Sequence, residues 1–177
     1  TLFRSLRKTE AGGAQRGRMG LTVTPESVER ERDWLRDRAP VVVGLLNDTR
    51  DTLGARFGVD VDSVGESAYR TEVDAVFEDG EVAVNVAGYV GLLRELDVTG
   101  DYPGFVVDEV LGRELAAAIA GGQPLSLLAQ ATFHVADGLT HSDGAAGADD
   151  LDAALAAGFQ TRLPGWEWRD GESPFAV

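Results

Sequence analysis

The amino-acid sequence predicts a mainly helical α+β fold, with five or six helices and one small β-hairpin; an all-α bundle is the alternative. Three observations support this prediction. Apolar residues recur at helical spacing over most of the 177 residues, typical helix start and stop signals separate these stretches, and one segment changes to alternating valines. A hydrophobic fraction of 44% is enough for one core, so residues 19–177 are expected to form a single globular domain.

The first 18 residues differ from the rest of the chain. They hold five basic residues and one acidic residue, and Lys8 is the only lysine in the chain. Met19, the only methionine, precedes a stretch that leads directly into a helix. We therefore expect residues 1–18 to be a leader foreign to the native protein, read through from upstream or from a sequencing adapter. The alternative is a basic arm that binds an anionic surface.

The first two helices are marked by their boundaries. Thr24 can cap the free N–H groups of a helix, and Pro25 suits the first helical position. The stretch 26–39 is expected to be helical, and Pro40 is expected to break or kink it. Apolar residues near helical spacing then predict a second helix over about 41–57, which Gly58 is expected to stop.

The segment 70–96 departs from the helical pattern. Apolar residues alternate on both sides of the Asp79-Gly80 pair, namely Val73, Ala75 and Phe77 before it and Val82, Val84 and Val86 after it. An Asp-Gly pair between two alternating runs is a hairpin signal, and valine favours strands. We therefore expect a β-hairpin here, with one continuous helix through 70–96 as the alternative.

The second half of the chain is predicted to be helical. Helices are expected over residues 89–98, over 104–120 up to a Gly-Gly pair, and from Gln123-Pro124 to about residue 138. The Gly/Ser/Asp-rich stretch 141–148 is expected to be a turn, and 149–158 a final short helix.

The composition limits the classes of function. The net charge is −14, and the acidic, lysine-poor body is typical of a cytoplasmic protein from an extreme halophile. In molar salt the Debye length is about 3 Å, so many carboxylates repel one another little. Contacts with phosphates weaken steeply in such salt, so we expect no nucleic-acid binding. No apolar run is long enough to cross a bilayer, and the absence of cysteine excludes disulfides and thiolate sites.

Both histidines lie in the stretch 130–144. On a helix, Gln130, His134, Asp137 and His141 share one face, and imidazole and carboxylate groups are suitable ligands for a divalent transition metal. The two histidines are two helical turns apart, roughly 10 Å, so binding one ion requires the helix to end before His141. We take His134, Asp137 and His141 as the candidate metal ligands.

The alternative places this polar stripe in solvent. Leu128, Ala131, Val135 and Leu139 form an apolar face of the same helix, which is then expected to pack on the core. Two further acidic groups are open to both a metal-binding and a structural interpretation. Asn47, Asp48 and Asp51 could hold Mg²⁺ or form a polar patch, and the aspartates of 149–152 suit the first turn of a helix.

The C-terminal segment contains two of the three tryptophans. Trp166 and Trp168 alternate with Glu167, so both rings point the same way if the segment is extended. Exposed, they would form an aromatic patch for a partner. The alternative is that they pack the C-terminal segment onto the core.

No catalytic motif of high specificity occurs in the chain. We therefore expect a small soluble cytoplasmic protein that acts without a cofactor, through contact with a protein partner or with itself. The alternative is a metal-dependent hydrolase in which His134, Asp137 and His141 hold an ion whose bound water is the nucleophile.

Overall fold

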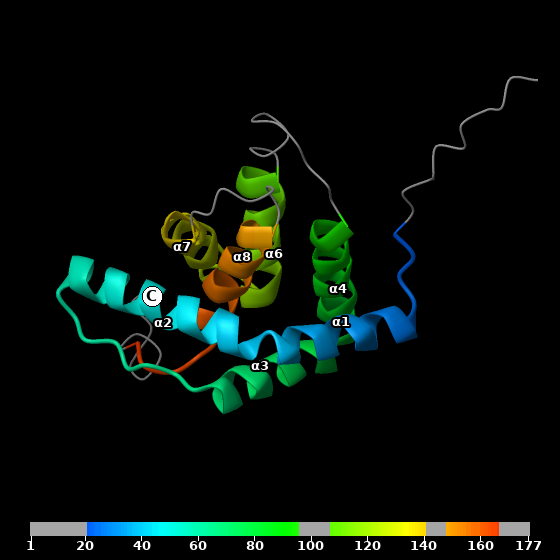
Figure 1. Ribbon diagram of the computed structural model, residues 1–177, viewed down its shortest axis with the longest axis horizontal. Helices are drawn as coiled ribbons and strands as arrows, with labels where there is room; N and C mark the ends of the chain where they lie inside the picture. Colours follow the sequence, from blue (N-terminus) through cyan, green and yellow to red (C-terminus); the bar gives the residue numbers. More distant parts are fainter. Residues whose placement is uncertain (1–20, 96–106, 141–147, 167–177) are drawn as a thin grey trace, which may run out of the picture.

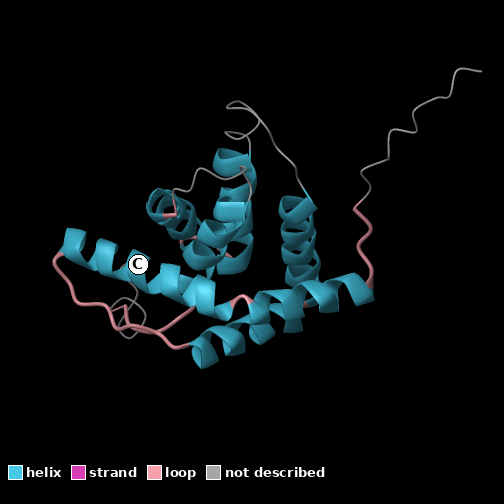
Figure 2. Cartoon of the chain, viewed as in Figure 1, coloured by secondary structure: helices cyan, strands magenta, loops and turns pink. Residues whose placement is uncertain are grey.

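The protein is all-α over residues 21–95, 107–140 and 148–166, the parts that the computed structural model describes (Figures 1 and 2). These parts hold seven α-helices and one π-helical turn, and no strand. The elements are α1 (Pro25–Asp37), α2 (Ala39–Phe57), α3 (Glu66–Glu78), α4 (Gly80–Glu95), η1 (Val107–Gly112), α6 (Arg113–Ala120), α7 (Leu125–Leu139) and α8 (Ala148–Gln160). The predicted α+β class is therefore wrong.

Helices α1 and α2 lie one after the other along the long axis of the molecule, and the other helices form two groups along this axis. In Figure 1 these two helices follow one another along the molecule, with α3 running beside α1 and α4 standing upright on it. The other group is made of α6, α7 and α8, which pack against one another, and α7 and α8 also pack on α2. Contacts of α4 with α6 and α8 join the two groups into one core.

The predicted boundaries of the first two helices are confirmed. Thr24 caps α1 reciprocally with Ser27: the Thr24 hydroxyl accepts from the Ser27 N–H at 3.2 Å, and the Ser27 hydroxyl accepts from the Thr24 N–H at 2.8 Å. Only Arg38 separates α1 from α2, because Pro40 has no N–H to continue the hydrogen-bond ladder. At its other end α2 stops at Gly58, whose φ of 68° is left-handed.

The predicted hairpin is replaced by the helices α3 and α4, so the alternative of one continuous helix is also wrong. Asp79 has extended dihedral angles, and its carboxylate accepts from the backbone N–H groups of Glu81 and Val82 at 3.1 and 3.2 Å. The Asp-Gly pair is thus the capped start of a helix rather than a two-residue turn. The valines follow helical spacing, since Val86 is fully buried whereas Val84 is 47% exposed.

The separate helix predicted over 89–98 is, up to residue 95, the second half of α4. The helices predicted after it are confirmed in position, and one of them differs in character. The predicted helix 104–120 is described from residue 107 as η1 followed by α6, and α7 and α8 lie within two residues of their predicted ranges. The last helix, however, is the centre of the bundle. Every residue from Asp150 to Thr161 is buried, as expected for a helix surrounded by α2, α6 and α7.

Candidate interaction surface

The candidate metal ligands are only partly brought together. His134 is exposed on α7, with its ring edge-on to Phe133 at 5.8 Å between centroids, and Asp137 lies one turn further on. His141 lies outside the described residues. Within residues 21–95, 107–140 and 148–166 no three His, Asp or Glu side chains are arranged to hold a metal ion. The metal site therefore stays a prediction.

Helix α7 has two apolar faces, and the face that was expected to meet the core is not the one that does. The buried side chains are those of Ala129, Thr132, Phe133 and Ala136, which face α6, α8 and α2. The face that was expected to be buried points outward, since Leu128 and Leu139 are 37% and 45% exposed. Both stripes follow helical spacing, so periodicity alone cannot say which of them meets the core.

The outward face of α7 forms an exposed apolar stripe. Leu127 is 55% exposed, Ala131 and Gly138 are exposed, and Val135 is half-buried. We call the set of Leu127, Leu128, Ala131, Val135, Gly138 and Leu139 the α7 stripe. It spans about 120° of the helix surface at 100° per residue. Asp137 is the only charged residue in α7, in a chain with 26% charged residues.

The inner face of α7 holds the helix firmly in place. The Thr132 hydroxyl accepts from the amide of Gln160 at 3.3 Å and donates to the carbonyl of Leu128 at 2.8 Å. Phe133 packs against Gly112, where an added Cβ would lie 2.6 Å from the ring. The α7 stripe is thus presented by a rigid helix at the edge of the bundle, on the left of Figure 1.

Trp166 packs the residues that follow α8, 161–166, onto the core. The ring is 7% exposed, and its Nε1–H donates to the Oε1 atom of Gln160 at 2.9 Å. The guanidinium of Arg50 lies 6.0 Å from the ring centroid. Trp168 lies outside the described residues. Of the two tryptophans that were predicted to form a partner patch, Trp166 is therefore buried in the interior.

Arg50 is a buried cation that sequence reasoning did not single out. The side chain is fully buried in α2, and its guanidinium donates to four backbone carbonyls. These are the carbonyls of Asp62, Pro164, Gln160 and Leu163, at 2.7, 2.6, 3.4 and 3.2 Å. Three of them belong to the end of α8 and the turn after it, where a positive charge is favourable. One side chain thus holds α2, the loop before α3 and the end of α8 together.

One member of each acidic group makes structural contacts in the described residues. Asp152 is 8% exposed and accepts two hydrogen bonds from Arg38, at 2.8 and 2.7 Å, so it lies inside the protein and not on the solvent side of a first helical turn. The Asn47 amide bonds the N–H and carbonyl of Val64, at 2.9 and 3.0 Å, and so fixes the loop onto α2. Asp48 and Asp51 are exposed.

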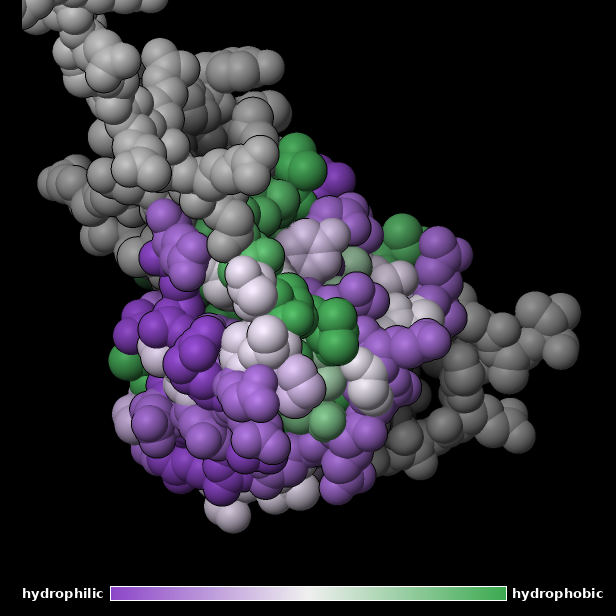
Figure 3. Space-filling model, turned by 90° about the vertical axis from the view of Figure 1, so that its right-hand side faces the viewer, coloured by the Kyte–Doolittle hydropathy of each residue, from purple (hydrophilic) through white to green (hydrophobic). Residues whose placement is uncertain are grey.

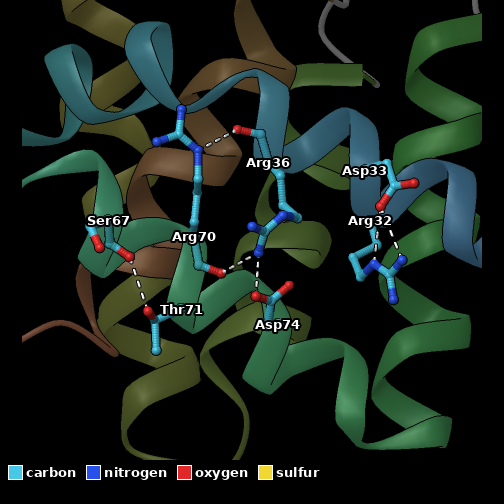
Figure 4. Close-up of polar contacts among 7 residues, drawn as sticks. All are labelled: Arg32, Asp33, Arg36, Ser67, Arg70, Thr71 and Asp74. Atoms are coloured by element: carbon cyan, nitrogen blue, oxygen red, sulfur yellow. Dashed lines mark hydrogen bonds and ion pairs between the residues drawn. The ribbon is translucent and has the colours of Figure 1, made fainter.

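Reciprocal arginine contacts join α1 to α3 (Figure 4). Arg36 donates to the carbonyl of Arg70 at 3.4 Å and pairs with Asp74, whereas Arg70 donates to the carbonyl of Arg36 at 3.3 Å. Arg70 also pairs with Glu66, one turn before it, at 2.8 Å. These half-exposed groups fix the register of the two helices, so their charges serve packing rather than chemistry.

Alkaline pH is expected to destabilise the fold through Tyr69. Burial raises the pKa of its hydroxyl, which donates to the carbonyl of Leu35 at 3.1 Å. Tyrosine in the unfolded chain ionises near pH 10. The stabilisation is therefore complete below about pH 10 and is lost as the pH rises towards the higher folded-state value, by about 1.4 kcal/mol per unit.

Urea unfolding of the wild type and of Tyr69→Phe between pH 8 and 11 checks this expectation. At pH 8 the variant should lose about 0.5–1.5 kcal/mol, the contribution of one hydrogen bond. Above pH 10 the stability difference between wild type and variant should shrink or reverse, because Tyr69 of the wild type then ionises in the unfolded chain. The other titrating groups are the same in both proteins, so their effects cancel in the comparison. A constant difference over the whole range would contradict the role of Tyr69.

The opposite side of the molecule offers a weaker candidate surface. Figure 3 shows apolar side chains among polar ones on this side. Leu21 and Val23, in the residues before α1, are each 42% exposed. A cavity of about 200 Å³ lies between residues 21–23, α1 and α4. Its buried carboxylate, Glu31, is already paired with Arg94 at 2.5 Å. The α7 stripe is therefore the more continuous apolar surface.

Comparison with known proteins gives a family and no activity. In the described residues no helix is both long and apolar enough to span a membrane. None of the curated proteins and none of the solved structures is similar enough to the chain to count as a match. One family model, described as Domain of unknown function (DUF7984), matches residues 21–177. The chain, all-α in its described residues and with an apolar outer stripe on α7, belongs to this family.

Proposed function

We propose that the protein is a binding module of a salt-rich cytoplasm that acts through protein–protein contact, with the α7 stripe as its contact surface. The observation that carries this proposal is the exposure of Leu127, Leu128 and Leu139 along one face of a rigid helix. Contiguous exposed apolar surface of this kind is typical of protein-binding sites. The stripe positions 128, 131 and 135 have the i, i+3, i+7 spacing with which a helix face fits a groove or another helix.

High salt favours an apolar contact of this kind. Screening weakens the attraction between opposite charges on two surfaces, so ion pairs contribute little to binding at a Debye length of about 3 Å. Burial of apolar side chains does not depend on that attraction. The charged faces of an acidic protein therefore keep it in solution, and an uncharged face can still bind a partner.

Photocrosslinking in cells that make the protein tests this proposal. A photoreactive amino acid at Leu127 should give a covalent protein adduct, and the same group at Thr71, an exposed position on α3, should give none. The adduct should disappear when Leu139 is replaced by aspartate and persist when Glu78, exposed on α3, is replaced by aspartate. Equal adducts from Leu127 and Thr71, or no adduct from Leu127, would refute the proposed surface.

A further inference from the structure

We infer that the partner at the α7 stripe is a second copy of this chain, bound antiparallel about a two-fold axis. This inference rests on the proposed function, because it names the occupant of the same surface. Its basis is the arrangement of side chains along the stripe, the distribution of charge and the area available.

The α7 stripe is self-complementary when one copy is reversed against another. Its members fall into three pairs that are symmetric about position 133 in sequence and about one line along the helix surface. The two-fold operation then brings each pair to one level of the interface: Leu127 with Leu139 of the second copy, Leu128 with Gly138, and Ala131 with Val135. The same surface therefore serves both copies, as a two-fold interface requires.

The distribution of charge also favours a second copy. The chain carries a net charge of −14, so most contacts between two copies bring like charges together. The α7 stripe contains no charged residue, and Asp137, the only charge in the helix, lies beside it on the His134 side. Two copies can therefore approach each other along this face at the least electrostatic cost.

The available area predicts a weak dimer. Helix α7 has 15 residues and is about 22 Å long, so a pair of such helices lies below about 1,200 Å² of buried surface. Interfaces of this size belong to transient complexes, and we expect a dissociation constant on the order of 1–100 µM. The dimer should strengthen as KCl is raised, because screening removes the repulsion between the acidic faces.

Disulfide mapping tests the arrangement directly, because the chain has no cysteine of its own. Leu127→Cys and Leu139→Cys chains, one carrying a tag, are mixed in molar KCl and oxidised. An antiparallel dimer should give mainly the mixed disulfide, because two copies of Leu127 are roughly 18 Å apart along the axis. Thr71→Cys on α3 is the control and should give only the background of random collision.

Sedimentation of the full chain completes the test. The average mass should rise from 18.8 kDa towards twice that value between about 1 and 100 µM. Leu127→Glu should shift the midpoint at least tenfold, and Thr71→Glu should leave it unchanged. Leu127 is 55% exposed, so the variant should keep its helicity and unfolding midpoint.

The possible failures are distinguishable. If same-site disulfides dominate, or if the Leu127→Cys and Leu139→Cys mixture does not exceed the Thr71→Cys background, the antiparallel dimer is refuted. If the mass also stays at 18.8 kDa up to about 100 µM, no second copy binds. In either case an adduct of other mass in the cellular crosslinking retains the proposed function with a different partner, and the absence of any adduct refutes both proposals.

Discussion

Replacement of Arg50 by methionine is expected to lower the free energy of unfolding by about 3–5 kcal/mol, the largest effect of any single substitution proposed for this chain. Methionine fills a similar volume but donates no hydrogen bond. The carbonyls of Gln160 and Leu163, which Arg50 binds in the interior, would be left buried without their donor. A buried acceptor without a partner costs about 1–3 kcal/mol.

The same substitution at Arg56 is the matched control. Arg56 lies in the last turn of α2 and is exposed, so Arg56→Met should change stability by less than about 0.5 kcal/mol. Arg50→Lys should fall in between, because an ammonium keeps the charge but cannot reproduce the planar fork that reaches carbonyls in several directions. Urea unfolding monitored by circular dichroism measures all three. Equal changes in the free energy of unfolding for Arg50→Met and Arg56→Met would contradict a stabilising role of the buried Arg50.

Gly158→Ala is expected to lower the free energy of unfolding by about 1–3 kcal/mol. Gly158 lies in α8 where that helix crosses α6, and an added Cβ would lie 2.8 Å from the Cβ atom of Ile119 and 3.0 Å from the carbonyl oxygen of Ala116. One of these contacts is with backbone, so the methyl group cannot be accommodated by a change of rotamer. The two helices would have to move apart in the centre of the core.

Gly44→Ala is the control for helix propensity. Gly44 lies within α2, and no neighbouring atom comes within 4 Å of the place that an added Cβ would occupy. Alanine there should therefore stabilise the protein by about 0.5–1 kcal/mol. The opposite signs at the two glycines separate a steric effect from propensity. Thermal and urea unfolding of both variants measure it, and stabilisation by Gly158→Ala would contradict the close crossing of α6 and α8.

Local signals predicted the helix boundaries well. Thr24, Pro40 and Gly58 act through their own backbone and through neighbours in sequence, so the structure confirms their positions. The Asp79-Gly80 pair failed because the same dipeptide serves a hairpin turn and a helix N-terminus. Whether the dipeptide becomes a hairpin turn or a helix start depends on whether the flanking valines pack in a sheet or in a core between helices.

The candidate site was predictable only in part. The apolar positions Leu128, Ala131, Val135 and Leu139 were recognised, but the core was expected on their side of α7. The polar stripe of Gln130, His134 and Asp137 has apolar residues on both of its sides, so it does not show which apolar face meets the core. No local signal pointed to Arg50, because the carbonyls it binds include three from more than 100 residues later in the chain.

The amino-acid sequence was sufficient to place the beginnings and ends of the first helices, because caps, prolines and glycines act within one or two turns. The acidic, lysine-poor character of the chain likewise needs no structure to be seen. Tertiary packing, in contrast, makes α8 the central helix, places Asp152 and Arg50 in the interior, and turns the α7 stripe outward. Burial depends on contacts between distant segments, and the pattern within a single helix does not specify which of its apolar faces those segments will cover.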